Sequence, residues 1–226
     1  GLPELCEEQR ARIGSADRVS NPGCYSSTFI LLLRPLIDAG LIPTDVPISI
    51  HALSGYSGGG KSLIERWENH DNELADLQYE APYALGWVHK HIPEMQRYTG
   101  LTVQPQFLPA VGPFHSGMRV QVPLHESIFY NRPDGEEIWT LLNQRYAGEP
   151  FIQVAPFAGF EAVSENDLDP TGFNGSNQLQ IHVFPNPAGH ILLVGLLDNL
   201  GKGASGVAVQ CLNLMLGLPE EAGLPV

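Results

Sequence analysis

The sequence predicts an α+β domain built on a mixed, largely antiparallel sheet with helices on one face. Strand-like and helix-like segments follow one another in a mixed order rather than a regular alternation, which is typical of this class. Segments 178–184 and 190–197 flank the turn-forming segment 186–189 and predict a strand pair. The apolar run over 24–39 is long enough for a core helix. With 226 residues, 43% of them hydrophobic, the chain can bury a proper core.

The first elements can be justified one by one. The helix over 24–39 ends where Gly40 follows it, and we expect Pro35 to kink it. Residues 48–53 alternate between apolar and polar side chains and predict a strand. The glycine-rich loop 54–61 then leads into a helix over 62–69.

The second part of the chain begins with an irregular segment over 70–86. A proline and a glutamate at 93 and 94 are typical of the first turn of a short helix, which we expect to run to Tyr98 and to end at Gly100. The remaining expected elements are strands over 103–111, 119–124 and 151–154, a helix over 136–146, the strand pair, and a final helix over 204–216.

Charge and cysteine content exclude several classes of protein. The chain carries 12 basic against 25 acidic residues, a net charge of −13, which argues against nucleic acid or an anionic membrane as partner. No apolar run approaches the roughly 20 residues of a membrane span. The three cysteines lie far apart without a C-x-x-C spacing, so we expect neither a disulfide framework nor a zinc site. This use of cysteine favours a reducing, cytoplasmic location. The chain begins without Met, and we expect that an N-terminal segment is absent.

Cys24 is the most informative residue. It stands in Ser20-Asn-Pro-Gly-Cys-Tyr25, where a turn passes into the apolar helix. A thiol in the first helical turn faces unpaired backbone N–H groups and the positive end of the helix dipole, which favours the thiolate. We therefore expect a nucleophile with a lowered pKa. The alternative is a small buried apolar residue that only begins a core helix.

The segment His89-x-His91-x-x-Glu94 supplies candidate acid/base groups for such a thiol. Histidine titrates near neutral pH, and His91 and Glu94 would share a face if a helix begins there. Two histidines at i and i+2 make a poor helical metal pair and no third ligand is close in sequence, so we expect no metal. The alternative is that both histidines are solvated loop residues.

Two glycine-containing segments are candidate ligand-binding loops. Loop 54–61 would let the backbone approach a ligand and offer N–H groups to a phosphate or a carboxamide, although it does not match a Walker A motif. Segment 198–204 precedes the last helix, whose N-terminus could hold an anion. Hairpin turns, helix starts and capping loops use the same residues, and these remain the alternatives.

Taken in order, the segments around Cys24, loop 54–61, the His89–Glu94 segment and Leu197-Asp-Asn-Leu-Gly-Lys-Gly-Ala-Ser205 resemble N-acetyl-gamma-glutamyl-phosphate reductases over nearly the whole chain. The resemblance implies a cytoplasmic, NADPH-dependent enzyme of arginine biosynthesis that reduces an acyl phosphate to its aldehyde. It implies a homodimer or homotetramer whose catalytic domain is like the C-terminal domain of glyceraldehyde-3-phosphate dehydrogenase. Residues 1–197 would form this catalytic and dimerisation domain. Residues 198–226 would carry a helix that packs on an N-terminal Rossmann domain, which this sequence lacks.

The same resemblance implies roles for individual residues. Cys24 would form a thioester, His91 would act as acid and base with His89 as its rival, and Glu94 would orient the imidazole. Six residues would lie near the nicotinamide end of NADP: Ser54, Gly55, Ser57, Gly58, Gly59 and Asn199. Two other readings of the chain remain open, a cofactor-free thiol hydrolase or acyl transferase, and an inactive oligomerisation fragment.

Overall fold

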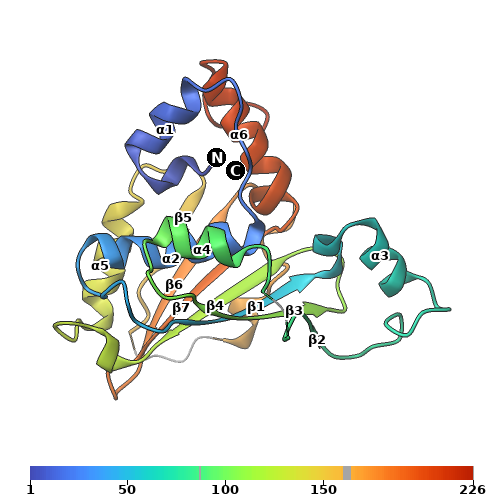
Figure 1. Ribbon diagram of the computed structural model, residues 1–226, viewed down its shortest axis with the longest axis horizontal. Coiled ribbons are helices and arrows are strands. Elements are labelled where there is room, and N and C mark those ends of the chain that lie inside the picture. Colours follow the sequence, from blue (N-terminus) through green and yellow to red (C-terminus); the bar gives the residue numbers. More distant parts are fainter. Residues whose placement is uncertain (87, 160–163, 226) are drawn as a thin grey trace.

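A computed structural model describes residues 1–86, 88–159 and 164–225, and a seven-stranded sheet runs through it (Figure 1). The strand order is β2-β3-β1-β4-β7-β6-β5. Two neighbouring pairs, β1 with β3 and β5 with β6, are parallel, and the other four are antiparallel. The expected mixed, largely antiparallel sheet is therefore confirmed. The strands are β1 (Ser49–Gly55), β2 (Ala81–Pro82), β3 (Gln106–Gly112), β4 (Met118–Leu124), β5 (Ile152–Val154), β6 (Leu179–Pro185) and β7 (Ile191–Leu197).

Helices α2, α4 and α5 lie over one face of this sheet, and α1 and α6 pair above α2 and α4, on the side away from the sheet (Figure 1). The helices are α1 (Glu7–Gly14), α2 (Cys24–Asp38), α3 (Lys61–Glu68), α4 (Ile92–Thr99), α5 (Gly135–Arg145) and α6 (Gly206–Met215). A π-helical turn, Gly201–Ser205, leads into α6. No helix in the described ranges is long and apolar enough to cross a membrane.

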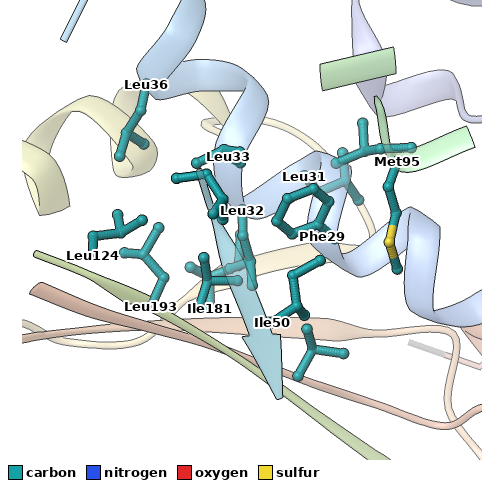
Figure 2. Packing of buried hydrophobic residues seen from close by; sticks show 14 of the residues in the cluster. Phe29, Leu31, Leu32, Leu33, Leu36, Ile50, Met95, Leu124, Ile181 and Leu193 are labelled. Atoms are coloured by element: carbon teal, nitrogen blue, oxygen red, sulfur yellow. The ribbon is translucent and has the colours of Figure 1, made fainter. Parts of the chain in front are cut away.

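The core lies between α2 and the sheet. Leucines and Phe29 of α2 face residues of β1, β4, β6 and β7, with Met95 of α4 closing one side (Figure 2). Because α2 is covered by the sheet on one side and by α4 and α5 on others, its run 29–33 is buried all round. Burial of each such large side chain contributes about 1.5–3 kcal/mol. The core holds the first turn of α2, and with it Cys24, on a rigid element.

Most expected elements are present, with shifted ends. Pro35 lies inside α2, β3 begins at Gln106 rather than at 103, and the last expected helix divides into the π-helical turn and α6. The irregular segment contains the two-residue strand β2, which pairs with β3.

Helix α1 was not expected from the sequence. Only one of its residues, Ile13, is buried, and it packs against Val207 and Cys211 of α6 in a small second core. A largely polar helix of eight residues has little local signal, so it forms here because α6 covers its single apolar residue.

Candidate active site

A cavity of about 570 Å³ opens between the start of α2, the end of β1, the histidine segment and the π-helical turn. Of the ten residues expected to form the site, nine line this cavity and Glu94 lies behind its wall. The nine are Cys24, Ser54, Gly55, Ser57, Gly58, Gly59, His89, His91 and Asn199. Segments separated by up to 175 positions thus meet at one place.

Cys24 is the first residue of α2 and is half-buried. The backbone N–H groups of Tyr25 and Cys24 and the charge of Lys90 each favour the thiolate. Burial opposes them and is the larger effect, so the pKa of the Cys24 thiol is raised to about 11. The expectation of a lowered pKa was therefore wrong for this structure. At neutral pH Cys24 is a thiol and needs a base to become a nucleophile.

His91 is buried beside the residue that precedes Cys24. Its ring lies so close to Gly23 that a Cβ atom built there would be 2.1 Å from Nε2. Burial and, second, the charge of His89 lower the pKa of His91 to about 4. The imidazole is therefore neutral at pH 7 and can accept a proton.

His89 is engaged on both ring nitrogens. Its Nδ1 accepts a hydrogen bond from the backbone N–H of His91 at 3.2 Å, which leaves the proton of the neutral ring on Nε2. Nε2 lies 3.3 Å from the hydroxyl of Tyr83, which in turn lies 3.5 Å from that of Tyr25. These contacts fix the His89 ring, whereas Nδ1 of His91 has no partner among the described residues.

Glu94 holds the turn before the nucleophile rather than the imidazole. One carboxylate oxygen accepts hydrogen bonds from the backbone N–H of Gly23, at 2.9 Å, and from the hydroxyl of Ser26. Within the described residues no hydrogen bond joins Glu94 to His91. The expected imidazole-orienting contact is thus absent here, and Glu94 instead fixes the first turn of α2.

Asn199 links two segments that line the cavity by hydrogen bonds. Its Oδ1 accepts a hydrogen bond from the backbone N–H of Gly117 at 2.7 Å, and its Nδ2 donates to the hydroxyl of Ser57 at 3.1 Å. Ser54, Ser57 and Asn199 are each at most 6% exposed. The loop after β1 is therefore tied to the start of the π-helical turn.

The π-helical turn forms the wall beside the thiol. A Cβ atom at Gly203 would lie 2.8 Å from Cβ of Cys24, so only glycine permits this approach. The neighbouring Lys202 is buried, and its ammonium group donates hydrogen bonds to the carboxylate of Glu4 and, at 2.7 Å, to the amide oxygen of Gln210. This buried network anchors the turn to the N-terminal segment and to α6.

Tyr83 and Lys90 are among the cavity residues to which the sequence assigned no role in the site. Tyr83 follows β2, which places it beside His89, and its irregular segment gave no local sign of this. Lys90 lies between the two histidines, and its position within that motif was a usable signal. It is the basic residue of the cavity among those that the structure describes.

The half-buried cysteine at the start of α2 and the two histidines before α4 lie within a stretch that belongs to the semialdehyde dehydrogenase class. Residues 24–199 match the family model described as semialdehyde dehydrogenase, dimerisation domain. The chain is also similar to N-acetyl-gamma-glutamyl-phosphate reductase 2 from Nostoc sp., with 49% identity over 99% of this chain and 71% of that protein. It is 45% identical to the enzyme of the same name from Pseudomonas putida, over 99% of this chain and 70% of that protein. The chain therefore belongs to the N-acetyl-gamma-glutamyl-phosphate reductase family.

Solved structures support the same fold. Aspartate semialdehyde dehydrogenase II from Vibrio cholerae has a TM-score of 0.70 at 19% identity, over 96% of this chain and 68% of that one. A probable aspartate-semialdehyde dehydrogenase from Pseudomonas aeruginosa has a TM-score of 0.63 at 18% identity, over 94% and 66%. The expected likeness to the C-terminal domain of glyceraldehyde-3-phosphate dehydrogenase is confirmed by these neighbours.

Proposed function

We propose that this protein reduces N-acetyl-gamma-glutamyl phosphate to N-acetylglutamate semialdehyde and phosphate, with NADPH, as a step of arginine biosynthesis. One observation carries the proposal: the Cys24 thiol and the neutral imidazole of His91 line the same cavity, and His91 lies against the residue before Cys24. The names of relatives at 45–49% identity supply the substrate.

Cys24 acts as the nucleophile and His91 as its base. As sulfur attacks the acyl carbon, Nε2 of His91 takes the thiol proton. The bond from that carbon to the phosphate oxygen breaks, phosphate leaves with the electron pair, and a thioester remains on Cys24. Because thiol and imidazole are both neutral at pH 7, proton transfer accompanies the attack. His89 is the weaker candidate for the base, because both of its ring nitrogens already have hydrogen-bond partners.

The far side of the cavity fits the nicotinamide end of NADPH. A Cβ atom at Gly58 would come within 3.2 Å of the Ser54 hydroxyl and 3.4 Å of the Asn199 amide, so the glycine leaves open a space edged by polar groups. Ser54, Gly55, Ser57, Gly58, Gly59 and Asn199 would hold that end. When bound, NADPH supplies the hydride that reduces the thioester. The protonated His91 then gives its proton to the substrate oxygen. As the bond from carbon to sulfur breaks and the aldehyde C=O forms, His91 takes this proton back and passes it to sulfur, so that Cys24 is again a thiol.

Helix α6 offers a docking surface for a dinucleotide-binding domain. Val207 and Cys211 pack against α1, whereas Val209, Leu212 and Leu216 are 36%, 49% and 63% exposed. Small residues at 204, 205 and 208 line the cavity at the start of the same helix. This arrangement supports a division into a catalytic unit, 1–197, and a segment, 198–226, that contacts the cofactor domain.

The sheet face opposite the helices supports self-association. The family model is that of a dimerisation domain. A shallow hollow on this face is lined by apolar and polar side chains of β1, β3 and β4, among them Leu53, Leu108 and Gln121. We propose that two copies meet there in a homodimer, or two such dimers in a homotetramer. The three cysteines are thiols, in keeping with a cytoplasmic enzyme.

Intact mass spectrometry tests the chemistry directly. The protein is mixed with N-acetyl-gamma-glutamyl phosphate without cofactor, alongside Cys24→Ser and, as matched control, Cys211→Ser. We expect one acyl adduct on the wild type and on Cys211→Ser, and none on Cys24→Ser. Addition of NADPH to the acylated protein in the presence of a dinucleotide-binding domain should release the adduct as aldehyde. If the adduct is lost in water alone as fast as it is lost with NADPH, the protein is instead a cofactor-free thiol hydrolase.

A further inference from the structure

An acyl phosphate brings negative charge into a strongly acidic protein. The chain has a net charge of −13, so the phosphate needs a placed cation close to the nucleophile. Among the described residues that line the cavity, Lys90 is the one lysine or arginine. Its exposed side chain can reach a ligand without loss of a buried partner.

The other basic residues are engaged elsewhere or lie outside the cavity. Lys202 is buried against Glu4, and Arg119 donates to the carbonyl of Leu168. Lys61 begins α3 but does not line the cavity. Four other arginines form ion pairs with carboxylates: Arg10 with Glu149 and Glu220, Arg34 with Asp38, Arg66 with Glu73 and Arg132 with Glu126.

Lys90 is also close enough to act electrostatically on the reacting groups. Burial is the largest influence on the pKa of Cys24, His89 and His91. The positive charge of Lys90 lowers the pKa of all three groups, against the effect of burial at Cys24 and together with it at the two histidines. No carboxylate among the described residues forms an ion pair with Lys90. Its ammonium group is therefore available to an anion placed beside the thiol.

We propose that Lys90 binds the phosphate group of the acyl phosphate and stabilises it as it leaves the acyl carbon that Cys24 attacks. This inference rests on the proposed function and adds the residue that recognises the leaving group. The ammonium group donates to the phosphate oxygens while sulfur bonds to the acyl carbon, the carbon–oxygen bond to phosphate breaks, and His91 holds the thiol proton. In the reverse direction the same residue binds inorganic phosphate that attacks the thioester.

A different role for Lys90 would be to favour the thiolate of Cys24 whatever the acyl donor. Two donors with the same acyl group separate the two roles: N-acetyl-gamma-glutamyl phosphate and the p-nitrophenyl ester of N-acetylglutamate at the gamma position, which has no phosphate group. Both require Cys24 and His91, but only the first presents a phosphate. The rate of adduct formation on Cys24 is measured by intact mass for wild type, Lys90→Met, Lys90→Arg and Arg97→Met.

Arg97 is the matched control, since it is exposed and lies on α4 outside the cavity. We expect Lys90→Met to slow acylation by the acyl phosphate about 10- to 100-fold, the effect of losing a hydrogen bond to a charged group. Its rate with the p-nitrophenyl ester should change less than about threefold, which also shows that the variant is folded. Lys90→Arg should recover part of the lost rate, and Arg97→Met should match the wild type with both donors.

If Lys90→Met slows acylation of Cys24 equally with both donors, or with neither, the assignment of Lys90 is overturned and the proposed function stays intact. A wild type that reacts with the ester but never with the acyl phosphate would overturn the proposed function, and the role of Lys90 with it.

Discussion

The imidazole of His91 packs against Gly23, where a Cβ atom would lie 2.1 Å from its Nε2. The position before Cys24 must therefore lack a side chain if His91 is to remain beside the thiol. We expect Gly23→Ala to displace the ring and to lower the rate of Cys24 acylation about 100-fold, because misplacing a catalytic group by about 1 Å costs that much. Intact mass at timed intervals measures the rate.

Gly86→Ala is the control for that change, because a Cβ atom at Gly86 meets nothing within 4 Å. It should acylate at the wild-type rate. If Gly23→Ala reacted as fast as the wild type, His91 would not be the proton acceptor for Cys24.

The lowered pKa of His91 predicts a loss of stability in acid. Burial holds this pKa at about 4 in the folded protein, against 6.5 for the ordinary group. Between these values the unfolded chain binds a proton that the folded protein does not, so folding weakens as the pH falls from about 6.5 to 4. The contribution of His91 to this loss is about 3 kcal/mol.

Denaturant unfolding of wild type and His91→Gln at pH 7 and pH 4.5 measures this contribution. The free energy of unfolding of the variant should fall less over that range, since glutamine does not titrate. Parallel losses in the two proteins would mean that the His91 ring is protonated when folded.

The carboxylate of Glu94 predicts an effect on the nucleophile without contact to the substrate. It accepts hydrogen bonds from the Gly23 N–H and the Ser26 hydroxyl, and bonds to a charged acceptor are roughly twice as strong as neutral ones. Glu94→Gln should therefore loosen the turn and slow acylation about tenfold, whereas Ser26→Ala, which removes one of the two bonds, should slow it less. The timed mass measurement applies here too, and an unchanged rate in both variants would show that the turn is held by other contacts.

The location of the site could be predicted from the sequence because its signals are local. A Pro-Gly turn before an apolar run indicated where α2 begins and so where Cys24 lies. Glycines marked the loop after β1, and a left-handed Gly100 ended α4 as expected. Each of these features depends on residues within a few positions, and such patterns do not require knowledge of the tertiary fold.

The energetics of the site could not be predicted, because they depend on distant segments. The thiol is buried partly by Gly203, which lies far along the chain from Cys24, and this burial outweighs the helix-terminus effect on the pKa. The partners of Glu94 depend on how α4 packs on α2, since its carboxylate meets Gly23 across 71 positions. Helix α1 likewise depends on α6.

The buried pair of Lys202 and Glu4 predicts a large asymmetry between single and double variants. Both side chains are at most 1% exposed, and Gln210 donates a further hydrogen bond to Glu4 at 2.8 Å. Lys202→Met leaves the Glu4 carboxylate buried without its counter-charge, and we expect it to lower the free energy of unfolding by about 3–5 kcal/mol. The double variant Lys202→Met with Glu4→Gln removes both charges and should lose markedly less, as measured by denaturant unfolding at pH 7. Losses that simply add would mean that the two groups are hydrated and do not interact.

Because the pair anchors the turn that carries Gly203, the single variant should also expose Cys24. The measurement is the rate of reaction of Cys24 with iodoacetamide, which should be faster in the single variant than in the double variant.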